Sequence, residues 1–327
     1  QVPLDLSETE VTAGLFTEHS IVVIEGEVIN GTLKAHMMGF PPSEPRATSV
    51  NAIGHMDFFG TGLTPHQVVQ LEALEKRATD AMFVIISDVH LNSQVVLEKL
   101  RSIFAGFEKV TPAPVFVLMG NFCEKPMNMA SGSVEEARAR FKALAELIRD
   151  FPDLAESANF VIVPGPADPG AGNTLPRYPL PDTFTEDLRN VVRNLHLTTN
   201  PARLRFYSQE VVVYREDILK KMQRHCIIPP QNPADQPNMD VTEHLVKTLL
   251  EQGHLCPLPL CARPIHWDFD TSLLLYPLPH AVVLADRTEE YVWRMGGTVA
   301  FNPGSFATNS SFMVYRPATK ETDFSTV

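Results

Sequence analysis

Short apolar runs separated by polar and turn-forming residues make up most of the chain, and the spacing of these runs changes near residue 80. Before that point, two strand-like runs between residues 20 and 37 meet at Asn30-Gly31, a dipeptide that strongly favours a tight hairpin. Gly39-Phe-Pro-Pro then ends the pattern. This pattern fits a short β-barrel of the OB type over residues of about 10–63, and it fits a plain β-meander nearly as well.

Thr64-Pro65 follows, with a favoured N-cap residue before a proline at the first helical position. Val68, Leu71 and Leu74 recur at helical spacing and extend the predicted helix towards Thr79. We interpret residues 64–80 as a connector helix between a domain at 1–63 and a larger domain at 81–327.

From residue 81 onwards, predicted strands alternate with predicted helices. The strands are expected at 82–87, 115–119, 160–163, 281–285, 298–301 and 312–315, with a hairpin at 204–214. The helices are expected to begin at about 93, 133 and 240. This order predicts a mixed α+β fold, a β-sandwich flanked by helices, with functional loops at the carboxyl ends of its strands.

The amino-acid composition makes some classes of function less probable for this chain. The 327 residues include 27 basic and 39 acidic side chains, a net charge of −12, which disfavours direct binding to a nucleic-acid backbone. No apolar run approaches the roughly 18–20 residues of a membrane span, so no membrane association is expected. The chain begins with Gln1 rather than Met, which suggests a fragment or a processed form. Its four cysteines form no CxxC pair. We therefore interpret them as free thiols in a reducing compartment and not as a zinc site.

The most suggestive chemistry follows the first strand of the larger domain. Asp88-Val-His90 stands at the end of the apolar run 82–87, where binuclear metallophosphoesterases carry their first two metal ligands. Asp-x-His at a strand end is often incidental, so its weight depends on the later ligand positions of such a site.

Those later positions have lost most of their ligands. After the second strand, Asn121 stands where a carboxylate would bridge two cations, and an amide cannot neutralise them. After the third strand, the segment Pro164–Asp168 keeps only a glycine and the final Asp of the expected ligand motif. His254 can supply a later histidine, although its position just past a helix end favours a helix-terminal residue over a ligand. Asp286 stands where a final His-x-His is expected.

The remaining ligands allow at most one weakly held cation, whereas two-metal hydrolysis needs a shared bridging group. We therefore predict no catalytic residue, no metal and no cofactor. The vestigial phosphoesterase site would comprise Asp88, His90, Asn121, Asp168, His254 and Asp286.

Several longer segments carry a resemblance that extends from about Leu15 to Pro317. They include Gly120-Asn-Phe122, Val163-Pro-Gly-Pro-x-Asp-Pro-Gly170, Leu197-Thr-Thr-Asn-Pro-x-Arg203, Arg215-Glu-Asp217, Gln252-Gly-His-Leu-x-Pro-Leu-Pro-Leu260 and Asn302-Pro-Gly-Ser-Phe306. With them the chain resembles the B-subunits of the eukaryotic replicative DNA polymerases alpha, delta and epsilon, most closely those of the epsilon branch.

The resemblance implies an OB-fold packed on an inactive calcineurin-like phosphoesterase domain. It also implies a non-catalytic nuclear scaffold that binds the C-terminal zinc region of the polymerase epsilon catalytic subunit and helps link it to the replicative helicase. Candidate contact regions are the Pro-rich loops 164–181 and 229–237, the segment Leu255–Leu260, and the aromatic residues Trp267 and Phe269.

Two other functions remain open on the residues alone. One is a mononuclear phosphodiesterase or 3′–5′ exonuclease that uses Asp88, His90 and His254. The other is single-strand DNA binding by the OB region, which needs basic and aromatic side chains. That region offers little basic charge, only Lys34 and Arg46 between residues 20 and 63, and its aromatic residues are Phe40, Phe58 and Phe59.

Overall fold

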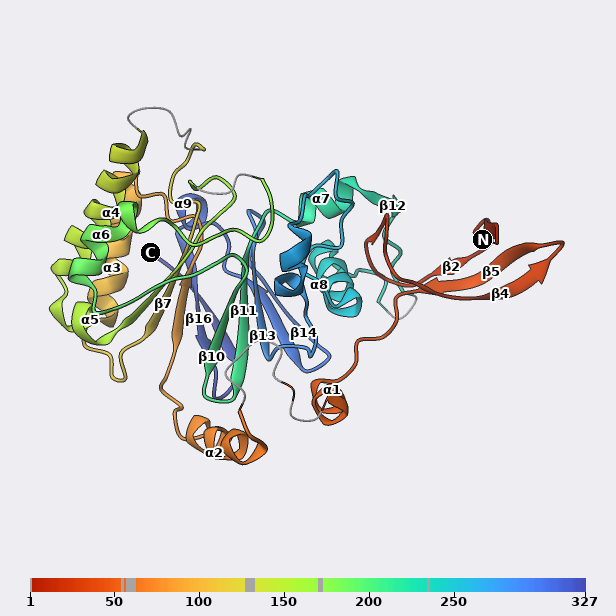
Figure 1. The fold of residues 1–327 in the computed structure, drawn as a ribbon, viewed down its shortest axis with the longest axis horizontal. Coiled ribbons are helices and arrows are strands. Elements are labelled where there is room, and N and C mark those ends of the chain that lie inside the picture. The colour runs from red at the N-terminus through yellow and green to blue at the C-terminus, as the bar shows by residue number, and fades with distance from the viewer. Residues whose placement is uncertain (1, 54–55, 57–62, 127–132, 170–172, 234–235) are drawn as a thin grey trace.

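Two β-sheets face each other at the centre of the molecule, and helices cover the outer face of each (Figure 1). The computed structural model describes residues 2–53, 56, 63–126, 133–169, 173–233 and 236–327. The predicted mixed α+β fold, with a sandwich flanked by helices, is confirmed. Within the described ranges, no helix is both long and apolar enough to cross a membrane.

The first sheet has six strands in the order β17-β16-β6-β7-β8-β9. Its bounds are β6 Phe83–Ile86, β7 Val115–Met119, β8 Asn159–Val163, β9 Asn194–Leu197, β16 Ser311–Arg316 and β17 Glu321–Thr326. The strands β6 to β9 are parallel, so their carboxyl ends meet at one edge. β17 is a polar edge strand that the apolar pattern did not indicate.

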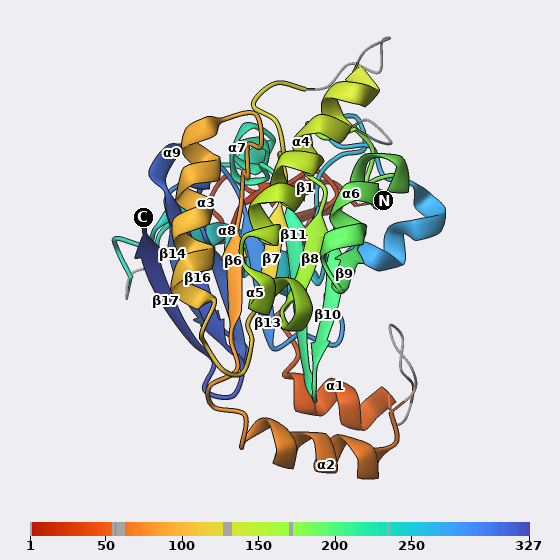
Figure 2. The same cartoon turned by 90° about the vertical axis from the view of Figure 1, so that its left-hand side faces the viewer.

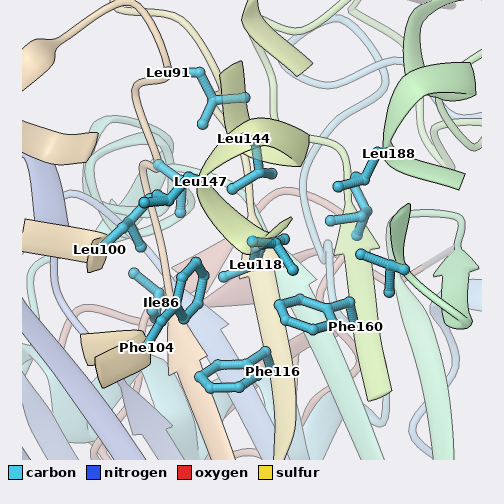
Figure 3. Close-up of a cluster of buried hydrophobic side chains, with 14 of the residues drawn as sticks. Ile86, Leu91, Leu100, Phe104, Phe116, Leu118, Leu144, Leu147, Phe160 and Leu188 are labelled. Carbon is cyan, nitrogen blue, oxygen red and sulfur yellow. The ribbon is translucent and has the colours of Figure 1, made fainter. Parts of the chain in front are cut away.

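Both faces of the strands β6, β7 and β8 are buried, which explains their continuous apolar runs. Val84 and Ile86 point towards the helices, whereas Phe83 and Ile85 point towards the second sheet. Figure 3 shows the helix side of this core. There the rings of Phe116 and Phe160 stack with centroids 5.0 Å apart.

Helices cover the outer face of the first sheet (Figure 1). They are α3 Gln94–Phe107, α4 Ser133–Arg149, α5 Pro152–Ser157 and α6 Asp182–Val191. Leu100, Leu144 and Leu188 come from three different helices and lie in the same core (Figure 3). The predicted helix beginning near residue 93 is confirmed, with Ser93 as its N-cap.

The second sheet has the strand order β10-β11-β13-β15-β14. The strands are β10 Ala202–Phe206, β11 Gln209–Arg215, β13 Ala281–Ala285, β14 Tyr291–Met295 and β15 Thr298–Asn302. Alternate residues of β11 enter the two cores, with Val211 and Val213 between the sheets and Val212 and Tyr214 on the helix side. The helical elements of this part are α7 Leu219–Arg224, α8 Val241–Gln252 and the 3₁₀ helix η1 Trp267–Leu273. The short helix α9 Phe306–Asn309 belongs to the other side, because Phe306 is buried in the core between the first sheet and its helices.

The N-terminal region forms the expected hairpin, which projects away from the body (Figure 1). Its elements are β1 Leu4–Asp5, β2 Glu10–Val11, β3 Phe16–Thr17, β4 Val23–Ile29, β5 Thr32–Gly39 and α1 Arg46–Ile53. At the turn, Asn30 and Gly31 both have positive φ, 52° and 81°, as a primed two-residue turn requires. In the described residues, however, β1, β2, β4 and β5 form an open sheet and not a closed barrel.

The N-terminal segment is attached to the body through α8 and the short strand β12 (Cys226–Ile228), which pairs with β3. Leu15 is fully buried, and its backbone N–H donates to Thr248 Oγ1 at 2.8 Å. The Gly14 N–H donates to His244 Nδ1 at 2.9 Å. Because both acceptors lie on α8, this helix fixes the β-rich region against the second sheet.

A helix is present where the connector was predicted, as α2 Pro65–Glu75, although it ends before Thr79. Its role as a connector between two domains stays a prediction. Thr64 caps the helix, as the sequence indicated. Its last residue, Glu75, accepts a hydrogen bond from Gln209 Nε2 at 2.6 Å and so fixes the helix to the first residue of β11. Both α1 and α2 lie at the end of the sandwich where β6 begins (Figure 2).

Candidate functional site

Three of the residues predicted for the site come together at the carboxyl ends of β6, β7 and β8. Asp88 follows β6 with a positive φ of 56°, a conformation that Asp tolerates better than most residues. Its Oδ1 accepts a hydrogen bond from the backbone N–H of Asn121 at 3.1 Å. The Asn121 side chain accepts in turn from the Ala167 N–H at 2.7 Å. Asn121 thus joins the three loops by hydrogen bonds that an uncharged amide can make.

Asp168 is also part of this edge and acts as a hydrogen-bond acceptor for backbone groups. Its Oδ1 accepts from the Phe122 N–H and its Oδ2 from the Gly165 N–H, both at 2.7 Å. Burial raises the pKa of Asp168 to about 6, against the opposing effect of these two hydrogen bonds. The loops approach so closely that a Cβ on Gly120 would lie 1.8 Å from Asp168 Oδ2, which accounts for glycine there.

A buried arginine that was not predicted from the sequence forms an ion pair with one carboxylate oxygen of Asp88. The side chain of Arg215, at the end of β11, is 0% exposed, and its Nη2 lies 2.7 Å from Asp88 Oδ1. The Arg215 Nε donates to the Gly120 carbonyl at 2.7 Å. The available signal was a charged residue directly after the apolar run Val211–Tyr214, at a strand's carboxyl end.

The other oxygen of Asp88 is also occupied. Arg287 Nε lies 3.2 Å from Asp88 Oδ2, and Ser305 Oγ donates to the same atom at 2.9 Å. Burial alone would raise the pKa of Asp88, but the guanidinium groups of Arg215 and Arg287 outweigh it and lower the pKa to about 2. Asp88 is therefore an ionised partner of two arginines.

His90, the second predicted ligand, lies two residues further along the same loop. Burial lowers its pKa, although the negative charge of Asp88 acts in the opposite direction. Within the described part of the chain, its Nε2 has no hydrogen-bond partner. His90 is therefore expected to be a neutral imidazole at neutral pH.

His254 does not act with Asp88 as the sequence suggested. Both ring nitrogens of His254 have other partners, because Nε2 lies 3.2 Å from Asp270 Oδ1 and Nδ1 accepts from the Cys256 N–H at 3.0 Å. The expectation that His254 joins Asp88 and His90 as a ligand is therefore wrong. Asp286 accepts from the Leu219 N–H at 2.8 Å and holds the start of α7.

These residues do not fit a phosphoesterase metal centre. Among the described residues, no three His, Cys, Asp or Glu side chains come together in a way that could hold a metal ion. A divalent cation beside Asp88 would also face Arg215 and Arg287. At 4 Å its repulsion from one guanidinium is about 8 kcal/mol at the effective dielectric constant of protein sites. The positive charge that Asp88 attracts is already supplied by side chains.

A second buried ion cluster follows directly in the sequence. Glu216 Oε2 accepts from Arg177 Nη2 and from Arg263 Nη2, each at 2.6 Å, and Lys221 contacts its other oxygen. Burial raises the pKa of Glu216, but these three cations outweigh it and lower the pKa to about 2. Since Arg177 and Arg263 belong to two loops far apart in sequence, Glu216 holds both loops to the end of β11.

The predicted contact regions fall into two groups. Trp267 is 73% exposed, Phe269 is 47% exposed, and the Phe269 ring meets that of Tyr178 edge-on at 6.4 Å. In contrast, Leu255 and Leu258 are buried in the core, so the prediction that Leu255–Leu260 forms an exposed contact surface is wrong except near its last residue. The Pro-rich loops 164–181 and 229–237 are partly outside the described residues.

The OB region offers little for stacking nucleic-acid bases. Phe40 is buried and stacks on Phe16 with ring centroids 4.1 Å apart. Arg46 is engaged by Glu210 at 3.2 Å. Phe58 and Phe59 lie outside the described residues.

Comparison with known proteins then identifies the family. The family profile that describes the B subunit of DNA polymerases alpha and epsilon matches residues 83–293, which is more than half of the chain. The chain belongs to this DNA polymerase alpha/epsilon B-subunit family. A second profile, described as DNA polymerase epsilon subunit 2-like, OB-fold domain, matches residues 1–42. The resemblance expected from the sequence is therefore confirmed. The OB assignment is supported by this profile for residues 1–42, although the described strands of this region form an open sheet.

Relatives within the B-subunit family come from distant eukaryotes. The chain is 44% identical to the Arabidopsis thaliana B subunit of DNA polymerase epsilon over 99% of its own length and 62% of that protein. Identity to the human DNA polymerase epsilon subunit 2 is 39%, over 98% of this chain and 60% of the relative. The chain thus spans about three fifths of these relatives. A solved archaeal phosphodiesterase aligns with 75% of this chain and 99% of its own, at 12% identity and a TM-score of 0.40, too low to establish a common fold.

Proposed function

We propose that this chain is a non-catalytic accessory subunit of the nuclear DNA polymerase epsilon holoenzyme. It binds the C-terminal zinc region of the catalytic subunit and helps link that subunit to the replicative helicase. Family membership supports the polymerase role. The proposal that the chain is non-catalytic rests on one observation: Arg215 and Arg287 form ion pairs with the two carboxylate oxygens of Asp88.

The proposed organisation follows the sequence division. Residues 1–63 form the OB-fold domain, 64–80 the connector, and 81–327 an inactive calcineurin-like phosphoesterase domain. Hydrolysis of a phosphodiester by two metals requires a free bridging carboxylate and room for both ions. Asn121 has no carboxylate, and Arg215 already pairs with Asp88, so we expect the domain to serve as a binding scaffold.

The exposed aromatic group formed by Tyr178, Trp267 and Phe269 is the part of the surface that we assign to the protein partner. Aromatic side chains are enriched among residues that dominate protein–protein binding energy. Direct nucleic-acid binding by this chain has little support, because the chain carries a net charge of −12 and Phe40 is buried.

The binding role is tested with the purified C-terminal zinc region of the polymerase epsilon catalytic subunit, by calorimetry or surface binding. We expect a stable complex, with affinity reduced roughly tenfold or more by Phe269→Ala. Phe324→Ala is the matched control, because Phe324 is 46% exposed, almost as much as Phe269, but lies on the edge strand β17. Failure of the unmodified chain to bind the zinc region would contradict the proposed function, whereas equal effects of the two substitutions would place the interface elsewhere.

The alternative, a metal-dependent phosphodiesterase or exonuclease with a mononuclear site, makes an opposite prediction. It requires turnover of a simple phosphodiester or of single-stranded DNA with added Mn²⁺, and loss of that turnover in Asp88→Asn. We expect no turnover in either protein. Mn²⁺-stimulated hydrolysis by the unmodified chain that Asp88→Asn abolishes would make this protein an enzyme.

A further inference from the structure

The surroundings of the Arg215 guanidinium resemble a cation-binding site. Among the described residues, four oxygen atoms contact it: Asp88 Oδ1 at 2.7 Å from Nη2, the Gly120 carbonyl at 2.7 Å from Nε, and Asp217 Oδ1 at 2.8 Å and the Ala285 carbonyl at 3.3 Å from Nη1. Two carboxylates and two backbone carbonyls are the kind of ligand set that hard cations take in proteins.

These oxygens come from both sheets of the sandwich. Asp88 and Gly120 follow β6 and β7 of the first sheet, while Asp217 follows β11 and Ala285 ends β13 of the second. A single buried side chain therefore connects the carboxyl edges of the two sheets. The distances fit the planar fork of a guanidinium, in which each N–H points in a fixed direction.

Among the described side chains that form ion pairs at this junction, the negative and positive charges are equal in number. Asp88 and Asp217 contribute two negative charges, and Arg215 and Arg287 contribute two positive charges through contacts of 2.7, 2.8 and 3.2 Å. The base of the Arg215 side chain is also fixed, because its backbone N–H donates to Asn200 Oδ1 at 3.1 Å and its carbonyl accepts from Asn200 Nδ2 at 2.6 Å.

We infer that Arg215 is a built-in cation that performs the structural work of the metal ions this site cannot hold, and that shortening it leaves an oxygen-lined cavity able to bind a small guanidinium ion. The inference rests on the contacts of Arg215 alone and does not require the proposed polymerase role. Geometry matters as well as charge here, since a spherical ion lacks the fork that reaches Asp88, Gly120 and Ala285 at once.

The test is chemical rescue of Arg215→Ala, measured as the thermal unfolding midpoint with a few millimolar methylguanidinium at constant ionic strength. We expect Arg215→Ala to unfold several degrees below the unmodified chain, and methylguanidinium to recover part of that shift. At this concentration the denaturing action of guanidinium compounds is negligible, because it becomes appreciable only towards molar concentrations. Sodium at equal ionic strength should recover nothing.

The matched control is the double substitution Asp88→Asn with Arg215→Ala. It removes the carboxylate but keeps a residue that tolerates positive φ, so methylguanidinium should rescue it far less. Equal rescue of the single and double variants, or no rescue of Arg215→Ala, would overturn the inference. So would recovery by Mn²⁺ in place of methylguanidinium, because the cavity would then prefer a metal ion.

A milder variant keeps the inference testable if Arg215→Ala does not fold. Asp88→Asn alone leaves Arg215 buried without its closest carboxylate, so its unfolding equilibrium constant should rise roughly a hundredfold or more. Combining Asp88→Asn with Arg215→Met should cost less than the sum of the two single substitutions. An unchanged stability of Asp88→Asn, or strict additivity, would show that this ion pair does not hold the sheets together.

Discussion

At the scale of single residues, the candidate site depends on close approach between loops. Gly165 has no room for a side chain, because a Cβ there would lie 2.7 Å from both Asn121 Oδ1 and the Gly120 carbonyl carbon. We expect Gly165→Ala to lower the free energy of unfolding by about 1–3 kcal/mol, the usual cost of overpacking.

Urea unfolding followed by circular dichroism measures this change. Gly106→Ala is the control, since Gly106 lies in α3, where an added methyl group would meet no atom within 4 Å, and the substitution should gain about 0.5–1 kcal/mol of stability from helix propensity. Equal responses of the two variants would mean that the loops around Asn121 can separate without cost.

Glu216 is expected to make the stability of the protein depend on acid pH. Its pKa falls from 4.5 to about 2 in the folded state, so its contribution is present above pH 4.5 and is lost as the pH falls through 2. The shift corresponds to a contribution on the order of 3 kcal/mol at neutral pH.

The measurement compares the unmodified chain with Glu216→Gln in urea at several pH values. The variant leaves Arg177 and Arg263 buried without a carboxylate, so it should be clearly less stable at pH 7. The difference between the two proteins should shrink steadily between pH 4.5 and 2. A difference that stays constant over this range would show that Glu216 is not held ionised by its three cations.

How much of the site the sequence could predict is also decided residue by residue. Asp88, Asn121 and Asp168 each follow a buried parallel strand, and the ends of such strands must meet at one edge, so their proximity could be predicted. The pairing of Arg215 with Asp88 could not be predicted. It depends on how the second sheet packs against the first, and no local sequence pattern encodes that arrangement. His254 was assigned by its order in the chain, while its actual partner Asp270 lies on η1, an element that the sequence pattern did not indicate.

At the scale of elements, helix α8 connects the β-rich N-terminal region to the body. Thr248 is fully buried, and its Oγ1 accepts from the Leu15 N–H at 2.8 Å. Thr248→Val keeps the shape but leaves this N–H without an acceptor, so we expect a loss of about 1–3 kcal/mol in the free energy of unfolding.

Thr185→Val supplies a closely matched control. Thr185 is also a fully buried helical threonine, yet its Oγ1 has no hydrogen-bond partner within the described residues. Replacing this hydroxyl with a methyl group should leave stability unchanged or raise it. Hydrogen exchange at Leu15 adds a local readout, and it should accelerate in Thr248→Val alone.

The elements that the sequence predicted are those with a single dominant local signal. β7 and β13 are uninterrupted apolar runs, and the hairpin turn at Asn30-Gly31 requires residues that accept positive φ. By contrast, β17 is polar and forms only because β16 offers it an edge, so tertiary pairing decides its state. The open N-terminal sheet illustrates the same limit, since closure of a barrel depends on strand partners and not on the pattern within each strand.

At the scale of the whole molecule, the two sheets are joined at their carboxyl edges by a covalently attached cation, so stability should not depend on metal supply. A site that binds a metal ion at a hundred times its dissociation constant gains about 2.7 kcal/mol from that binding. In a chain of this size such a gain raises the unfolding midpoint by several degrees. We therefore expect excess EDTA and millimolar Mn²⁺ to give the same midpoint, because Arg215 already satisfies Asp88 and repels a second cation. An EDTA-sensitive midpoint in the unmodified chain would show that a metal ion reaches this junction, and Asp88→Asn would then reveal whether Asp88 is the residue that binds it.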